Sequence, residues 1–323
     1  MQDDRLTFEN AFLIPLNDAV DLAFFTEGVK LVNGIMSKVA FKSIGTDGLS
    51  RKVSGQIKDD GGALITTFKS LHKGMGAFHL KPEAEKKYFA HLLFNQRLYI
   101  IPLPQASDQG ITMSVNIPGV DNRLYLTIRY MTSKTDTQKY VAGSAYGKVR
   151  FAIPIKTTGD SCLIKIPLEL FPEGVSSLTV LDGNFNPECE RLIYVDKNQR
   201  FKIEIEPDSS FYRTRSKVTL MIKTTGPHGM PVQTDLSLAV VDKEQIIKGG
   251  IMGICAYKLL SSELQGQIED ADYYFKDDSC TDRDALDMLL LTQGYRKFLT
   301  ANANPIGEKF QPERSFDISG KIK

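Results

Sequence analysis

The chain has 323 residues, of which 42% are hydrophobic and 24% are charged, and its 40 Lys and Arg nearly balance its 39 Asp and Glu. This composition is that of a globular protein with real cores, which excludes a disordered chain, and the length suggests two or three domains. Balanced charge gives no general attraction to nucleic acid, so we expect no nucleic-acid partner. No apolar stretch approaches the roughly 20 residues that span a bilayer, so we expect no transmembrane segment.

Residues 18–105 carry short segments in which apolar and polar residues alternate. Turn-forming residues separate them, as in the sequence Gly-Thr-Asp-Gly at 45–48. Such turns tolerate positive φ, and strands with turn signals about every ten residues are typical of a β-sandwich. The expected strands are 38–42, 53–58, 63–70, 77–80 and 87–94.

A second set of strands follows the proline-rich sequence at 102–104, which marks a domain boundary. We expect a second sandwich over 106–199, built by the same alternation. Its expected strands are 112–116, 124–129, 149–153, 162–166, 177–181 and 190–195.

The third region, 200–323, begins with strand patterns at 201–205 and 217–223. The second of these resembles 38–42 in composition and is followed by a similar turn, which indicates an internal repeat. The nearly continuous apolar run at 235–242 is typical of a strand covered on both faces. These features predict a third sandwich.

Two segments of the third region have helical spacing instead, and they predict a helical insertion over about 250–300. The first covers 254–264, with Leu260 and Leu264 on one face. The second covers 283–293, with Thr281 or Asp282 as the capping residue and Gly294 as its end. The predicted fold class is therefore all-β: tandem immunoglobulin-like or fibronectin-III-like antiparallel β-sandwiches, the third with a small helical insertion.

Catalytic chemistry finds little support in the sequence. There are four histidines and no G-x-S-x-G, Walker A or strand-coupled G-x-G-x-x-G motif. His72 and His79 flank the turn at 74–76 and would make half a metal site, but no acid or Cys completes it, so we interpret them as turn histidines. We predict no catalytic residue, no metal and no cofactor.

The four cysteines are Cys162, Cys189, Cys255 and Cys280, and none forms a C-x-x-C pair. A zinc site is therefore not expected. Separate buried thiols are the main interpretation. A disulfide between Cys162 and Cys189 is the alternative in an oxidising compartment.

The aromatic cluster Tyr273, Tyr274 and Phe275 lies between the two predicted helices, in an otherwise acidic and polar stretch. It is either an exposed contact for a protein or glycan, or a staple that attaches the insertion to the sandwich. We favour the staple, because three large rings rarely remain exposed without a function. As ligand contacts, these three residues are the only candidates that the sequence offers.

Several segments resemble the alpha-2-macroglobulin superfamily, in particular a branch from the envelope of Gram-negative gut bacteria. The sequence LSLAVVD at 236–242 is similar to the strand that precedes the insertion region in that superfamily. Other resembling segments, in chain order, are 25–28, 31–34, 72–78, 186–192, 259–264, 273–275 and 287–296.

The resemblance implies macroglobulin-like sandwiches of seven strands and a location in the bacterial cell envelope, periplasm or outer membrane. Relatives in this branch often continue into a carboxypeptidase-regulatory-like domain and a TonB receptor plug, and 316–322 looks like the first strand of such a further domain. Two departures matter. The thioester sequence Cys-Gly-Glu-Gln is absent, so covalent trapping is not implied, and Thr26-Glu27-Gly28-Val29 stands where Pro-Glu-Gly-Gly is usual.

Three hypotheses follow. The first is a non-enzymatic envelope module that separates neighbouring domains or docks a protein partner. The second is a protease-sensing or protease-trapping protein with a cleavable loop at 243–253 or 276–281. The third is a glycan-binding module of a TonB-linked uptake system, which rests on the three aromatic residues. We favour the first hypothesis.

Overall fold

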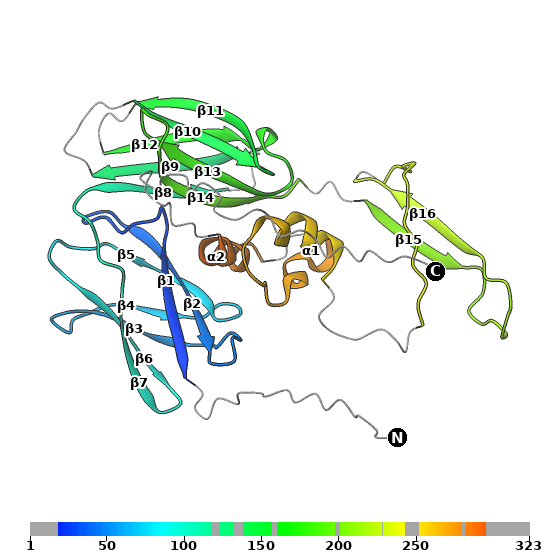
Figure 1. The fold of residues 1–323 in the computed structure, drawn as a ribbon, viewed down its shortest axis with the longest axis horizontal. Helices are drawn as coiled ribbons and strands as arrows, with labels where there is room; N and C mark the ends of the chain where they lie inside the picture. Colours follow the sequence, from blue (N-terminus) through cyan, green and yellow to red (C-terminus); the bar gives the residue numbers. More distant parts are fainter. Residues whose placement is uncertain are drawn as a thin grey trace, which may run out of the picture.

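The computed structural model describes residues 19–117, 123–131, 138–156, 160–197, 201–227, 229–242, 252–278 and 282–294. It is a mostly β protein with several antiparallel sheets, which confirms the predicted fold class of tandem β-sandwiches. Figure 1 shows two sandwiches with the helices between them and a separate hairpin.

The first sandwich consists of a three-stranded sheet, β1-β2-β5, and a four-stranded sheet, β4-β3-β6-β7. Alternate residues of β2, such as Val39 and Phe41, are fully buried between them. The rings of Phe41 and Phe68 meet edge to face at 5.0 Å, a geometry that adds about 0.5–1.5 kcal/mol to simple burial. The strands are β1 Val20–Thr26, β2 Ser37–Gly45, β3 Ser54–Asp59, β4 Leu64–Lys69, β5 Met75–Leu80, β6 Tyr88–Phe94 and β7 Arg97–Pro102.

The second sandwich repeats this plan, with sheets β12-β9-β8 and β11-β10-β13-β14. Its core contains Leu124, Leu126 and Ile128 on one face of β9, all fully buried. The strands are β8 Gly110–Asn116, β9 Arg123–Met131, β10 Gln138–Ala145, β11 Lys148–Lys156, β12 Ser161–Pro167, β13 Gly174–Leu181 and β14 Pro187–Val195, and the short 3-10 helix η1 spans Leu168–Leu170.

The two sandwiches share one strand order. When the strands of each are numbered from one to seven, one sheet has the order 1-2-5 and the other has the order 4-3-6-7 in both. In each, the second strand pairs antiparallel with the first and the fifth. The two sandwiches are therefore repeats in topology, whereas the repeat that the sequence indicated was between 38–42 and 217–223 of the third region.

The third region differs from the expected sandwich. Among its described residues the sheet structure is one hairpin, in which β15 (Lys202–Pro207) pairs antiparallel with β16 (Leu220–Thr225). Ile203 and Ile205 share one face of the hairpin with Leu220 and Ile222, and both isoleucines remain 52% exposed. By its place in the chain, this amphipathic hairpin corresponds to strands 1 and 2 of the complete sandwiches, and no other strand covers it among the described residues of this region.

The expected strand at 235–242 is not formed. These residues are described, carry no strand and are exposed, with Val240 at 82%. Before them, Val232 donates its amide to Thr224 O across the turn that follows β16. The apolar run therefore follows the hairpin without joining a sheet, and the described part of this region has no further strands that would cover it.

The helical insertion falls where the sequence placed it. Helix α2 spans Arg283–Gln293, and its N-terminus is capped by the Asp282 side chain, which accepts from Ala285 N. Gly294 ends it. The predicted helix at 254–264 is shorter, since α1 spans Ile254–Leu259 and is followed by 3-10 turns. These are η3 (Ser261–Glu263) and η4 (Ala271–Asp278). We refer to residues 252–278 and 282–294 as the helical segment.

Candidate functional site

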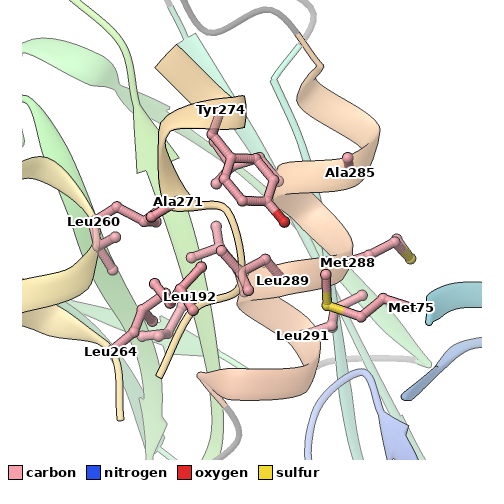
Figure 2. Close-up of a cluster of buried hydrophobic side chains, with 14 of the residues drawn as sticks. Met75, Leu192, Leu260, Leu264, Ala271, Tyr274, Ala285, Met288, Leu289 and Leu291 are labelled. Atoms are coloured by element: carbon pink, nitrogen blue, oxygen red, sulfur yellow. The ribbon is translucent and has the colours of Figure 1, made fainter. Parts of the chain in front are cut away.

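The helical segment packs against the first two sandwiches. One apolar cluster unites Ala40 and Met75 of the first sandwich and Leu192 of the second with the buried side of the segment. Figure 2 shows Met75 and Leu192 approaching Leu289 of α2 from different sides. Seven of the eleven residues of α2 are buried in this way, which is typical of a helix packed into a core. We call this meeting place of three parts the junction.

A buried ion network lies in the junction. The Arg191 guanidinium, 4% exposed on β14, binds Glu27 Oε1 through Nε at 3.0 Å and Asp287 Oδ1 through Nη2 at 2.5 Å. Lys38 Nζ binds the other oxygen of Asp287 at 3.1 Å. The network thus joins the first sandwich, the second sandwich and α2 through one guanidinium.

Burial and the neighbouring charges shift the pKa values of the two carboxyls of the junction in opposite directions. Burial raises the pKa of Glu27, and the nearby Arg191 and Lys38 oppose that rise. Burial also disfavours the charge of Asp287, but Arg191 and Lys38 outweigh it and lower the pKa of Asp287. In the same way Asp287 and Glu27 outweigh the burial of Arg191 and raise its pKa. Removal of one member would leave a buried charge without its partner, which costs about 3–5 kcal/mol in proteins.

A cavity of about 440 Å³ lies beside this network. Its lining comes from the end of β8, from β14 and from the first turns of α2, and it combines apolar side chains such as Leu168 and Leu290 with the charges of Arg283 and Asp284. No Ser, Cys or His is among the lining residues. The cavity therefore offers a binding surface of mixed polarity, lined by apolar, acidic and basic side chains.

The three aromatic candidates divide by position. Tyr274 is fully buried in the junction core and cannot present its ring to a ligand. Tyr273 is half-buried, stacks on His72 at 3.8 Å and donates its hydroxyl to Asp282 at 2.9 Å. Phe275 packs edge to face against Tyr194 of β14 at 6.0 Å. The rings act as a staple, but onto the first two sandwiches instead of the third.

The remaining sequence candidates have structural positions. His72 lies against Tyr273, whereas His79 is exposed on β5 opposite Lys38. Across the described ranges, no three His, Cys, Asp or Glu side chains are placed to hold a metal ion.

The cysteines of the described part are separate thiols. Cys162, Cys189 and Cys255 are free, so the alternative of a Cys162–Cys189 disulfide is wrong. Cys189 is fully buried, and burial raises the pKa of its thiol, which makes it unreactive. Cys280 lies outside the described residues.

Sequence reasoning missed Arg191, Glu27, Lys38 and Asp287. A signal for Arg191 existed, because it stands at an inward position of β14, in phase with the buried Cys189, Ile193 and Val195. A charge at an apolar phase of a strand indicates a buried partner.

The fold and the junction define the class of this chain as a tandem β-sandwich protein. No protein-family model matches the chain, and no curated protein does. Similar solved structures include a tetra-tandem repeat from the extending region of a large adhesion protein, with TM-score 0.26 and 13% identity over 72% of this chain and 68% of that one.

Two further solved structures are similar to this chain. One is Escherichia coli alpha-2-macroglobulin activated by porcine elastase, with TM-score 0.23 and 14% identity over 60% of this chain and 24% of that one. The other is the BSP domain of a biofilm-associated protein, with TM-score 0.24 and 11% identity over 55% and 30%. At such scores these similarities carry nothing about function.

Within the residues that the structure describes, no helix has the length and apolar character needed to cross a bilayer.

Proposed function

We propose that this chain is a non-enzymatic module of the bacterial cell envelope, which holds neighbouring domains of a larger macroglobulin-like protein at a fixed separation and docks a protein partner. The observation that supports this proposal is the structure of the junction. Arg191 uses its guanidinium to join two sandwiches and α2, so the buried charges of Glu27, Arg191 and Asp287 connect three parts of the chain. The envelope location rests on the sequence resemblance alone.

Rigidity follows from how the junction is built. An interface between domains of one chain permits relative motion unless it is large and apolar. Here a shared apolar core and a buried ion network connect the sandwiches. A pair of sandwiches fixed in this way keeps its two ends at one separation, which is what a spacer requires.

The proposal is tested by the distance between the sandwiches. Spin labels at the exposed Thr67 of β4 and Leu163 of β12 report on that distance in pulsed electron paramagnetic resonance. They are attached to non-canonical residues introduced at these two positions. We expect one narrow distance distribution in the full chain. A broad or multiple distribution refutes the spacer. Detection of the native protein in cytoplasmic and not in envelope fractions of its host refutes the location.

The other two hypotheses gain no specific support. The proposed cleavable segments at 243–253 and 276–281 lie mostly outside the described residues. Of the aromatic residues proposed for a glycan, Tyr274 is buried.

A further inference from the structure

The helical segment belongs to one region by sequence and to another by packing. It follows hairpin β15–β16 in the chain, yet the apolar cluster that contains it includes no residue of 201–242. Its partners in that cluster are the first and second sandwiches. By sequence, the residues on both sides of the segment belong to the third region, 200–323.

Polar contacts line the margin between the segment and the first sandwich. Glu269 accepts hydrogen bonds from Ser50 N and from Ser50 Oγ, both at 2.9 Å. Tyr273 stacks on His72, and Asp287 binds Lys38. Half-buried contacts of this kind can exchange with water, unlike the apolar centre.

The margin with the second sandwich is equally extended. The Lys258 ammonium lies 5.8 Å from the ring centre of Tyr146. The chain at Leu259 passes so close to Gly174 that a Cβ there would lie 3.2 Å from Leu259 O. The segment thus contacts each sandwich along its length and closes the space between them.

The sandwiches also touch each other directly, where residues 27–34 of the first sandwich meet residues 107–113 and 189–191 of the second. Gly28, which follows β1, has φ of +90°, and a Cβ there would lie 2.9 Å from Met113 N and 3.1 Å from Thr112 Cα. The backbone of one sandwich therefore rests on the backbone of the next. Cys189 Sγ would lie 3.0 Å from the same Cβ, and Glu27 pairs with Arg191 beside it, so one compact patch joins the sandwiches without the helical segment, and a swing between them would turn about that patch.

The segment does not form a stable unit by itself. Its helices have 6 and 11 residues, and isolated helices shorter than about 12–15 residues are marginal in water. Its helical order therefore depends on docking, so leaving the junction and unfolding are one event. Such an element has two states, docked and released.

We propose that the helical segment is a clasp that opens as one unit, and that its opening frees the two sandwiches to swing about the Gly28 contact. This inference rests on the proposed spacer function, because it makes the separation held by the spacer adjustable.

The test uses the full chain with Leu289→Asp, which places a charge at the buried centre of α2. Amide hydrogen exchange and the distance between probes at positions 67 and 163 are measured together. We expect the α2 amides to exchange at least a hundredfold faster, the amides of β2 and β9 to keep their protection, and the distance distribution to broaden.

A milder variant tests the proposal if Leu289→Asp also destabilises the two sandwiches. Glu269→Ala removes two hydrogen bonds to a carboxylate at the margin, and we expect about tenfold faster exchange of the α2 amides. Glu206→Ala, a matched change on the exposed side of β15, should leave these rates unchanged.

Three results overturn the clasp. The first is loss of protection in β2 and β9 together with α2, which makes the segment part of an indivisible core. The second is release of α2 with an unchanged narrow distance, which removes the hinge. The third is equal exchange in the Glu269→Ala and Glu206→Ala variants. If the unmodified chain has a narrow distribution of the 67–163 distance, any of these results rejects the clasp and keeps the spacer. A broad distribution in the unmodified chain rejects the spacer itself.

Discussion

Replacement of Arg191 by Met tests whether the buried guanidinium joins the sandwiches. The change keeps much of the side-chain length but leaves Glu27, 6% exposed, without its ion-pair partner. Breaking a buried pair from one side costs about 3–5 kcal/mol. Asp287 retains Lys38 at 3.1 Å, so its loss is partial. We therefore expect the Arg191→Met variant to lose about 3 kcal/mol of unfolding free energy.

The pH dependence of this loss has a definite sign. Arg191 opposes the burial that raises the pKa of Glu27 above its ordinary 4.5, so the pKa of Glu27 rises further in the variant. A carboxyl with a raised pKa in the folded state takes up a proton on folding. The variant therefore recovers stability as the pH falls through the raised pKa toward 4.5. The double variant Glu27→Gln, Arg191→Met has no such charge and should recover most of the loss at neutral pH.

Urea unfolding followed by circular dichroism, between pH 4.5 and 8, measures these free energies. A loss below about 1 kcal/mol for Arg191→Met at neutral pH refutes the reasoning, because it places the guanidinium in the class of exposed pairs. A double variant no more stable than the single one refutes the role of the unpaired Glu27 charge.

Three further predictions follow from single residues. The Tyr274 hydroxyl is buried and has no hydrogen-bond partner within the described residues, so Tyr274→Phe should keep or gain stability, by up to about 1 kcal/mol, whereas Tyr274→Ala should lose about 3–5 kcal/mol in thermal unfolding; a clear loss in the Phe variant contradicts this. Gly28→Ala should lose about 1–3 kcal/mol more in urea unfolding than Gly48→Ala, since both have positive φ but only Gly28 has backbone in the way; equal losses argue against the close approach. Asp287 has a lowered pKa and loses its stabilising charge as the pH falls below its ordinary 3.8, so Asp287→Asn should show a flatter acid unfolding profile than the unmodified chain, and parallel profiles would contradict that role.

The elements that the sequence predicted are those whose pattern is local. Alternation in β2 and β9 places their apolar residues on one face, and helix α2 carries its own start and end in Asp282 and Gly294. Local signals of this kind depend on neighbouring residues alone.

Strand β10 had no readable pattern, because its inward positions include Gly143. A Cβ there would overlap the Phe151 ring, so a large residue from another strand fills the space that a side chain of β10 would take. The small residue is correct only in that tertiary context. The strand was invisible for this reason, although it pairs with both β11 and β13.

The docking of the helical segment was also out of reach of the sequence. Its apolar faces were predicted, but an apolar face does not name its partner. The ion network is a further case, since Glu27, Arg191 and Asp287 lie up to 260 residues apart and meet only in the fold, as the separation of 164 residues between Arg191 and Glu27 illustrates. For the same reason the aromatic staple was assigned to the wrong sandwich.

The order of the chain has a consequence for its synthesis. Both sandwiches end by Val195, but the piece that seals their junction ends at 294, which is 294 − 195 = 99 residues later. At about 5–20 residues per second, translation leaves the apolar surfaces around Met75 and Leu192 open to water for roughly 5–20 seconds. During that interval the nascent chain exposes an apolar patch that the folded chain buries. Such a patch is the kind of surface that chaperones bind.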